Sequence, residues 1–353
     1  MSKLRLAVIG AGAIGRTHIA LAKDHALFEL AAIVDASGPA QALAAQLGVA
    51  AYADTSAMLA ALRPDAVIVA TPNATHADIG TECLQSGAHV LMEKPITDTL
   101  EDARRLCMAA DQAGRVLLVG HQRRYNAILR AARGIVQSGR LGQLVSATGM
   151  ATWLKPDAYF DMAWRRQAGG GPILINLIHD IDLLRFLMGE IDSVQASSAR
   201  AVRGFEVEDT AAVIVRFRSG ALATLTVSDC ATAPWNWDLA AGESAHYARQ
   251  DVNSHFICGT HGSLTLPRLE VWDYRNERGW QAPLTQERTA VHEANPYAEQ
   301  LRHFHAVIEG NEAPVCSGRD ALLSLQAILA VRQAAESGEV VRLDAQAQAQ
   351  AQA

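Results

Sequence analysis

The sequence predicts an α/β protein: a doubly wound, parallel Rossmann sheet, followed by an α+β domain with an antiparallel sheet. In the first third of the chain, short apolar strands alternate with amphipathic helices. This alternation is typical of a parallel sheet with helices on both faces. Beyond residue 123 the strands are longer and follow one another with short turns, which favours antiparallel pairing.

The elements of the first domain are predicted from apolar runs bounded by turn or capping residues. The predicted strands span residues 4–9, 28–35, 64–71, 88–94 and 115–121. The predicted helices span residues 16–25, 37–48, 54–62, 76–87 and 99–114. We therefore assign residues 1–122 to the Rossmann domain.

The second domain, residues 123–343, is predicted to begin with a helix over 128–139. Its predicted strands span residues 142–154, 192–202, 209–217 and 220–229, and its late helices span 297–310 and 319–338. The last ten residues, 344–353, are a low-complexity repeat of Ala and Gln that has nothing to pack on, so we expect them to be disordered.

Composition excludes several classes of partner. The formal net charge is -6, and no Lys/Arg cluster marks a surface for nucleic acid or an anionic membrane. The five cysteines are scattered and form no CxxC, which fits a reducing cytoplasm. The N-terminal apolar run is too short for a signal peptide, and no apolar stretch is long enough to cross a membrane. We expect a cytoplasmic protein.

The stretch GAGAIG places Gly10, Gly12 and Gly15 in a GxGxxG pattern between a strand and a helix. Such glycines let the backbone approach a pyrophosphate, and the helix N-terminus offers free N–H groups. Asp35 ends the next strand, where a carboxylate accepts hydrogen bonds from the ribose hydroxyls and repels the 2′-phosphate of NADP. The pattern predicts NAD in preference to NADP. The alternatives are an ordinary glycine turn and a solvated strand end.

The segment ATPNATH, residues 70–76, follows the third predicted strand. In a doubly wound sheet the carboxyl ends of the strands border the ligand crevice. Pro72 and Asn73 are therefore expected along the cofactor. A turn that caps the next helix through Thr75 is compatible with this placement.

Four features in this order carry a resemblance: GxGxxG, TPNATH, EKP in MEKPIT, and GGG followed by a histidine and an aspartate. Together they resemble the Gfo/Idh/MocA oxidoreductases, which include glucose–fructose oxidoreductase and inositol 2-dehydrogenase, over residues 4–340. The resemblance implies a C-terminal α+β domain with a large, mostly antiparallel open sheet that forms homodimers or homotetramers. It also implies pyridine-nucleotide redox chemistry on sugars, cyclitols or related alcohols.

The resemblance also implies roles for single residues. Lys94 of the EKP is expected beside the nicotinamide and the reacting hydroxyl, and His179 is the acid/base residue of an HxxD that Asp182 completes. The expected cofactor-binding residues are Gly10, Gly12, Ala13, Ile14, Gly15, Asp35, Ala70, Thr71, Pro72, Asn73, His76, Glu93, Lys94, Gln122, Arg123, Trp164 and Arg165. The expected substrate-binding residues are Lys94, His121, Arg123, Lys155, Tyr159, Asn176 and His179.

One departure from the family pattern concerns an aspartate that many members carry four residues before the histidine. Ile175 stands there, and Asn176 follows it. If residues 173–188 form a helix, Asn176, His179 and Asp182 lie on one stripe at i,i+3 spacing. Either His179 works without the carboxylate, or Asp180 or Asp182 orients it, or the substrate differs. A buried core histidine paired with Asp182 is the structural alternative.

The chemistry explains the residue types. Oxidation of a secondary alcohol needs a base for the hydroxyl proton and a cation for the developing alkoxide. His179 suits the first role near neutral pH, and Lys94 suits the second. Lys155 and Tyr159 precede the glycine run, and a later segment, 234–247, offers further aromatic and polar groups for a hydroxylated ring. Its tryptophans equally suit a core or a subunit interface. His303 and His305 lack the partners of a metal site, and we assign no metal.

The leading prediction is an NAD-dependent dehydrogenase of a sugar, a cyclitol, or a related cyclic polyol or dihydrodiol. Two alternatives remain: an NAD-dependent glycosidase, and a catalytically silent regulatory protein that senses NAD.

Overall fold

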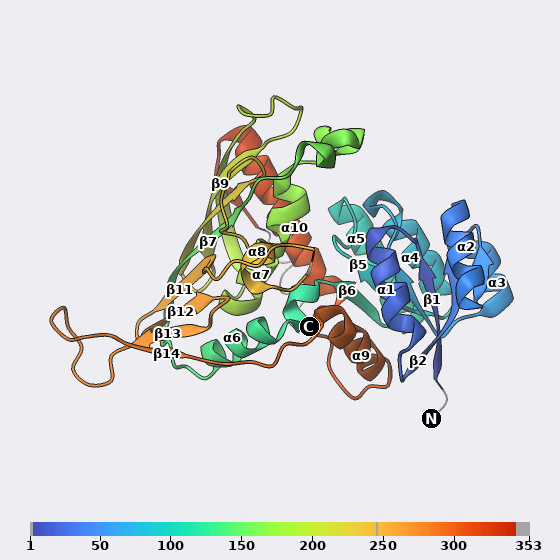
Figure 1. Ribbon diagram of the computed structural model, residues 1–353, viewed down its shortest axis with the longest axis horizontal. Coiled ribbons are helices and arrows are strands. Elements are labelled where there is room, and N and C mark those ends of the chain that lie inside the picture. The colour runs from blue at the N-terminus through green and yellow to red at the C-terminus, as the bar shows by residue number, and fades with distance from the viewer. Residues whose placement is uncertain (1–2, 245, 344–353) are drawn as a thin grey trace. The chain divides into compact units, whose positions relative to one another are not determined.

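The computed structural model describes residues 3–244 and 246–343 (Figure 1). By its internal contacts the chain divides into two units. The first unit holds residues up to 125 together with 295–325, and the second holds 126–294 and 326–343. The predicted second domain includes residues 295–325, whereas in the structure this segment belongs to the first unit. The predicted disordered tail, 344–353, lies outside the described residues.

The first unit is built on a parallel sheet, which has six strands in the described chain, in the order β3-β2-β1-β4-β5-β6. Its strands are β1 (Leu4–Ile9), β2 (Phe28–Val34), β3 (Ala50–Tyr52), β4 (Ala66–Val69), β5 (His89–Glu93) and β6 (Leu117–Gly120). Its helices are α1 (Ala13–Lys23), α2 (Gly38–Leu47), α3 (Thr55–Leu62), α4 (His76–Gln85), α5 (Leu100–Ala113) and α9 (Pro296–Ile308). The predicted Rossmann sheet is confirmed. The edge strand β3 was not predicted, because three half-buried or exposed residues are too few to show a pattern.

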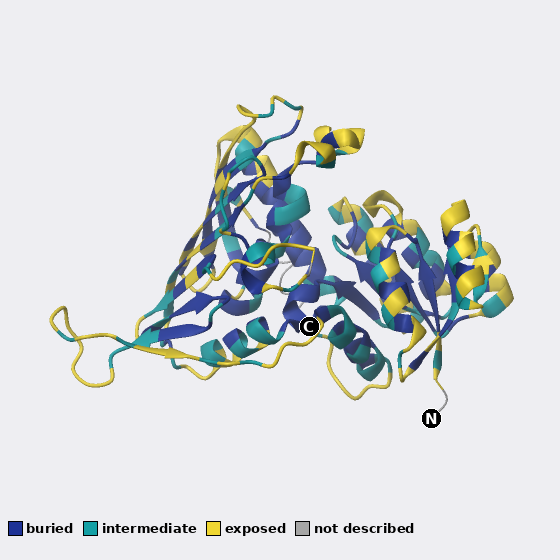
Figure 2. Ribbon diagram, in the orientation of Figure 1, coloured by how far each residue is buried: buried dark blue, intermediate teal, exposed yellow. Residues whose placement is uncertain are grey.

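The core of the first unit lies between this sheet and its helices. Apart from the edge strand β3, the strands are mostly buried, and the outer faces of the helices are exposed (Figure 2). Phe28 of β2 stacks on Phe304 of α9, with ring centroids 6.0 Å apart and planes at 22°. Burying a side chain of this size stabilises the fold by roughly 1.5–3 kcal/mol. A helix from late in the chain thus completes this core.

The second unit contains a mixed sheet, in which the described residues form nine strands in the order β14-β13-β12-β11-β7-β10-β9-β8-β15. Strand β7 pairs in parallel with β10, and the other pairs of this sheet are antiparallel. The strands are β7 (Leu144–Thr152), β8 (Ile191–Ala199), β9 (Thr210–Phe217), β10 (Leu222–Ser228), β11 (His255–Gly259), β12 (Gly262–Leu266), β13 (Glu270–Asp273), β14 (Thr285–Arg288) and β15 (Val341–Arg342). The predicted large, mostly antiparallel sheet is confirmed.

The helices of the second unit are α6 (Ala127–Gln137), α7 (Ile178–Met188) and the short α8 (Trp237–Ala241). The division between the units falls within α10 (Gly318–Ser337). Across residues 3–244 and 246–343, no helix combines the length and the hydropathy that a membrane span requires.

Candidate active site

In the glycine turn between β1 and α1, packing requires glycine at two positions, and a third position has space for a side chain. Gly10 has φ +93, and a Cβ on it would lie 2.5 Å from the Ala70 carbonyl oxygen. A Cβ on Gly15 would lie 2.0 Å from the Gly10 carbonyl oxygen. A Cβ on Gly12, the N-cap of α1, would meet no described atom within 4 Å. The turn therefore exposes backbone at a helix N-terminus, where a phosphate binds.

Asp35 follows β2 and is anchored by backbone groups. Its Oδ2 accepts a hydrogen bond from the Ala11 N–H at 2.8 Å, and its Oδ1 accepts one from the Ser37 N–H at 2.8 Å. Burial acts to raise the pKa of this carboxyl, but the hydrogen bonds from Ser37 and Ala11 outweigh it and lower the pKa. The carboxylate is therefore charged at neutral pH and keeps lone pairs for ribose hydroxyls. The open glycine turn and this anchored anion fit a dinucleotide.

The loop after β4 leaves Pro72 and Asn73 exposed. Thr75 Oγ1 donates to the Pro72 carbonyl oxygen at 2.8 Å, which stabilises the turn of η1 (Asn73–Thr75). His76 is completely buried, with Nε2 2.9 Å from the Thr71 carbonyl oxygen and Nδ1 3.0 Å from that of Pro95. Burial lowers the His76 pKa, so the neutral ring donates to one carbonyl at a time. His76 thus contacts both the loop after β4 and the loop after β5.

Glu93 ends β5 and holds the backbone of Lys94. Its Oε1 accepts from His18 Nε2 at 2.7 Å, and its Oε2 accepts from the Lys94 N–H at 3.1 Å. Burial acts to raise the pKa of Glu93, yet His18 and Lys94 together lower it. Gly120 leaves room for this carboxylate, because a Cβ there would lie 3.1 Å from Glu93 Cδ. Sequence reasoning missed His18, since its partner is 75 residues away.

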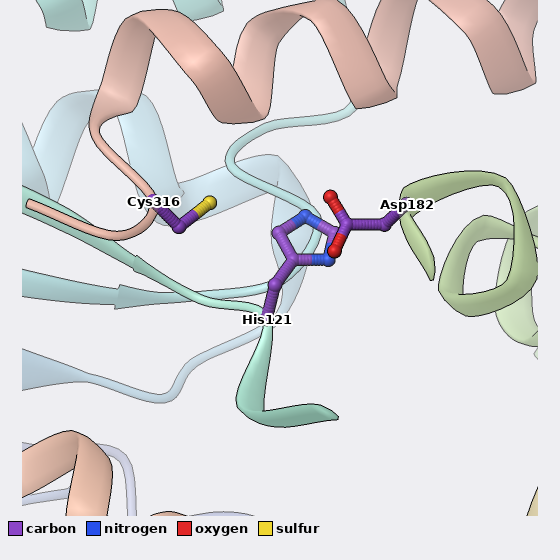
Figure 3. Close-up of side chains that lie close together, drawn as sticks. All are labelled: His121, Asp182 and Cys316. Carbon is purple, nitrogen blue, oxygen red and sulfur yellow. The ribbon is translucent and has the colours of Figure 1, made fainter. Parts of the chain in front are cut away.

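The segment after β6 lies at the same sheet edge, because parallel strands end together. His121, Gln122 and Arg123 are all buried there, the last two in η2 (Gln122–Tyr125). The Val119 N–H donates to the Cys316 carbonyl oxygen at 3.0 Å, which brings the segment before α10 beside β6. His121 and Cys316 offer side-chain atoms within 4.8 Å of each other (Figure 3). Asp182, which Figure 3 also labels, belongs to α7 of the second unit.

In the second unit, the run Gly169–Gly171 makes room for two other groups. A Cβ on Gly170 would lie 2.2 Å from the Trp164 carbonyl oxygen, and one on Gly171 would lie 2.3 Å from Glu208 Oε1. Glu208 in turn accepts the Ile173 N–H at 2.9 Å, at the start of the next helical turn. These close contacts explain Gly170 and Gly171, and Gly169 has φ +90, which favours glycine. Glu208 is a residue that the sequence pattern did not reveal.

The segment predicted as a helix over 173–188 is helical throughout, but it begins with a π turn, η5 (Ile173–Leu177), before α7. Asn176 lies in the π turn, so its expected i,i+3 relation to His179 does not follow from α-helical geometry. His179 and Asp182 both lie in α7 and are neighbours on it. His179 is half-buried and Asp182 is buried.

Asp180, considered above as a group that could orient His179, instead lies beside His255. Its Oδ1 lies 3.1 Å from His255 Nε2 on β11, and both side chains are almost fully buried. The His255 Nε2 atom has no hydrogen-bond partner in this arrangement of the described residues. Consecutive helix residues point in different directions, so this pairing directs Asp180 away from His179.

Lys155 and Asn176, both expected to bind substrate, are brought together. Lys155 Nζ donates to Asn176 Oδ1 at 2.7 Å and lies 3.7 Å from Asp229 Oδ2. The Tyr159 ring lies 4.6 Å from Nζ and 3.8 Å from the Arg165 guanidinium carbon. Burial, only partly opposed by Asp229, lowers the pKa of Lys155 to about 8.

Trp237 lies in the core, whereas Trp164 and Trp235 are partly exposed. Trp237 is fully buried and donates through Nε1 to Glu243 Oε2 at 2.7 Å, so it belongs to the core. Trp164 and Trp235 are 47% and 44% exposed. They remain candidates for ligand or subunit contacts.

A Rossmann unit with an open glycine turn, an anchored aspartate and a lysine at the end of β5 defines a nucleotide-binding oxidoreductase. The family model of the "oxidoreductase family, NAD-binding Rossmann fold" (GFO_IDH_MocA) matches residues 4–121, and the GFO/IDH/MocA C-terminal domain matches residues 129–265. The chain belongs to the Gfo/Idh/MocA family of oxidoreductases.

Three relatives illustrate the range of this similarity. The 1,5-anhydro-D-fructose reductase of Ensifer adhaerens is 33% identical, over 79% of this chain and 80% of that protein. The scyllo-inositol 2-dehydrogenase (NAD(+)) of Bacillus subtilis is 26% identical, over 97% of each chain. The crystal structure of the WlbA dehydrogenase from Bordetella pertussis, in complex with NADH and UDP-GlcNAcA, superposes with a TM-score of 0.80. Its sequence identity is 28%, and 97% of this chain and 99% of that chain are covered.

Proposed function

We propose that the protein is an NAD-dependent dehydrogenase that oxidises a secondary hydroxyl of a sugar, an inositol-like cyclitol or a related cyclic polyol or dihydrodiol. The observation that carries this proposal is the Asp35 carboxylate, which two backbone N–H groups anchor beside the open glycine turn. An anion there favours free ribose hydroxyls over a 2′-phosphate. The named substrates of the relatives, an anhydro sugar and an inositol, support the substrate class.

When bound, NAD would supply the hydride acceptor for oxidation of the substrate's carbinol carbon. In our proposal Lys94 places its ammonium near the oxygen that becomes negative, and His179 accepts the hydroxyl proton. The Glu93 carboxylate supports this step by holding the Lys94 backbone. The remaining proposed substrate contacts come from His121, Arg123, Tyr159 and Asn176, and Lys155 belongs to the same group of residues through its hydrogen bond to Asn176.

Two other functions predict different products. An NAD-dependent glycosidase would release nitrophenol from nitrophenyl glycosides when NAD is added. A regulatory protein that senses NAD would bind it without turning over any alcohol. The charged and anchored groups around Lys94 favour the dehydrogenase.

The testing experiment is a turnover screen with purified protein. NAD+ and NADP+ are each offered with inositols, aldoses, 1,5-anhydrosugars, methyl glucosides, quinate-like acids and aromatic dihydrodiols, and absorbance of the reduced nicotinamide is followed. We expect turnover with NAD+ and at least one cyclic polyol. In Lys94→Ala, turnover should fall by roughly 10²–10⁴-fold, while the exposed control Lys23→Ala stays at the wild-type rate. Calorimetric binding of NAD without any turnover would contradict the dehydrogenase.

A further inference from the structure

Lys155 determines which way a neighbouring amide faces. It is only 4% exposed, and its Nζ lies 2.7 Å from Asn176 Oδ1. An ammonium group has only donors, so the atom it faces must be the amide oxygen. The NH2 group of Asn176 is therefore turned to the other side of the amide, and Asn176 itself is half-buried.

The charges around Lys155 keep it in this place. Asp229 lies 3.7 Å from Nζ through Oδ2, but its Oδ1 accepts from Arg203 Nε at 2.9 Å. One carboxylate is thus shared between two cations, and Arg203 also donates to the Lys155 carbonyl oxygen at 2.9 Å. Arg165 adds a third cation, on the Tyr159 ring that Lys155 also faces. Asp157 lies 3.7 Å from Arg203, and Asp209 lies near Asp229, so the cluster combines cations with several carboxylates.

We propose that Lys155 is a positioning residue that acts through Asn176. It holds the amide so that its NH2 group is presented to the substrate, and this part of the site therefore takes an acceptor oxygen, such as a hydroxyl, ether or carbonyl oxygen. The inference rests on the proposed function. It assigns Asn176 a task that a carboxylate cannot perform, because an ionised carboxylate has no donor.

A pH dependence follows from the same contacts. Burial is the main cause that lowers the Lys155 pKa to about 8, Asp229 opposes it, and Arg203 and Arg165 add to it. Burial raises the pKa of Tyr159, the remaining titratable group facing Nζ, so the phenol stays neutral there. The ammonium is present below about pH 8 and is lost above it. A neutral amine can also accept, so it no longer fixes the amide orientation.

The kinetic test uses the compound with the highest kcat/KM in the turnover screen. We expect Lys155→Met to raise KM by about tenfold or more and to change kcat much less, with Lys155→Arg recovering part of the loss. Adding Lys155→Met to Asn176→Leu should cause no further loss. The wild-type KM should rise above about pH 8, and that of Lys155→Met should not. Equal KM values for the wild type and Lys155→Met, or independent effects in the double variant, would overturn the inference.

A second measurement needs no substrate. In protein with 15N-labelled asparagine side chains, the resonances missing from Asn176→Leu identify the Asn176 amide. We expect this amide to shift in Lys155→Met, and to titrate in the wild type with a midpoint near pH 8. The exposed control Lys23→Met should leave it in place. An unmoved amide refutes the positioning role even if turnover is found, whereas absent turnover with a moving amide contradicts only the proposed function.

Discussion

At the scale of single residues, the cofactor preference rests on Asp35. Replacing it by alanine removes the acceptor for the ribose hydroxyls and the charge that repels a 2′-phosphate. We expect Asp35→Ala to raise KM for NAD by about tenfold and to affect NADP less, so that the ratio of the two kcat/KM values narrows. Steady-state kinetics with both cofactors measure this ratio. Glu29→Ala, an exposed change on β2, is the control. An unchanged ratio would remove the assignment of Asp35.

Residues with a local signature could be predicted, and residues with distant partners could not. Gly10, Gly15 and Asp35 lie within one strand–turn–helix–strand segment, whose spacing alone indicates the nucleotide turn. His18 contacts a carboxylate 75 residues further along the chain. Glu208 caps a turn that lies 35 residues before it. No pattern along the sequence records such pairs.

At the scale of an element, different glycines of the turn before α1 are expected to serve NAD binding and to serve packing. A methyl group on Gly12 would meet no described atom, whereas one on Gly15 would overlap the Gly10 carbonyl oxygen. We expect Gly12→Ala to fold with a loss below about 1 kcal/mol but to bind NAD much more weakly. Gly15→Ala should unfold at clearly lower temperature. Thermal unfolding and calorimetric NAD binding measure the two effects.

The matched control for this turn is Gly38→Ala, which is also open and lies at the first residue of α2. It should change neither stability nor binding. Wild-type NAD affinity in a folded Gly12→Ala protein would show that the turn does not approach the cofactor.

A second prediction at this scale concerns the link between α1 and β5. His18→Leu would leave the buried Glu93 carboxylate without its 2.7 Å partner. Breaking a buried pair in this way costs about 3–5 kcal/mol. The pKa of Glu93 is lowered from 4.5, so its contribution to stability is present above pH 4.5 and is lost as the pH falls through the lowered pKa.

The urea midpoint of His18→Leu should therefore lie far below that of the wild type at pH 7, and the difference should shrink only as the pH falls below 4.5. The companion Glu93→Gln removes the titrating carboxyl and should show little of this pH dependence. A difference between wild type and His18→Leu that stays constant with pH would place the loss in packing around His18 instead.

At the scale of the whole molecule, the parallel sheet could be predicted because its longer strands are buried on both faces and alternate with helices. Strands β11 to β14 were not predicted. They have four or five residues each, and their burial patterns, from mostly buried in β12 to mostly exposed in β14, do not alternate regularly. The place of α9 also could not be predicted, since the contact between its Phe304 and Phe28 joins residues 276 positions apart.

The exposed face of the second sheet gives the last prediction. Phe256, Thr148, Thr224 and Ile214 stand opposite one another across four neighbouring strands, so they share one face. Phe256 and Ile214 are 43% and 50% exposed. We propose that this face joins copies of the chain into a homodimer or homotetramer, because apolar side chains gathered on an open sheet gain most by burial in an interface.

Charges on this face should separate the copies. We expect the double variant Ile214→Asp and Phe256→Asp to shift the mass measured by light scattering towards the 37.8 kDa of one chain, because burying two unpaired carboxylates in an interface is strongly unfavourable. Val202→Asp, at a turn where the side chain is 73% exposed, is the control and should keep the wild-type mass. A wild type that remains monomeric at high concentration, or a double variant of unchanged mass, would show that this face is not the interface.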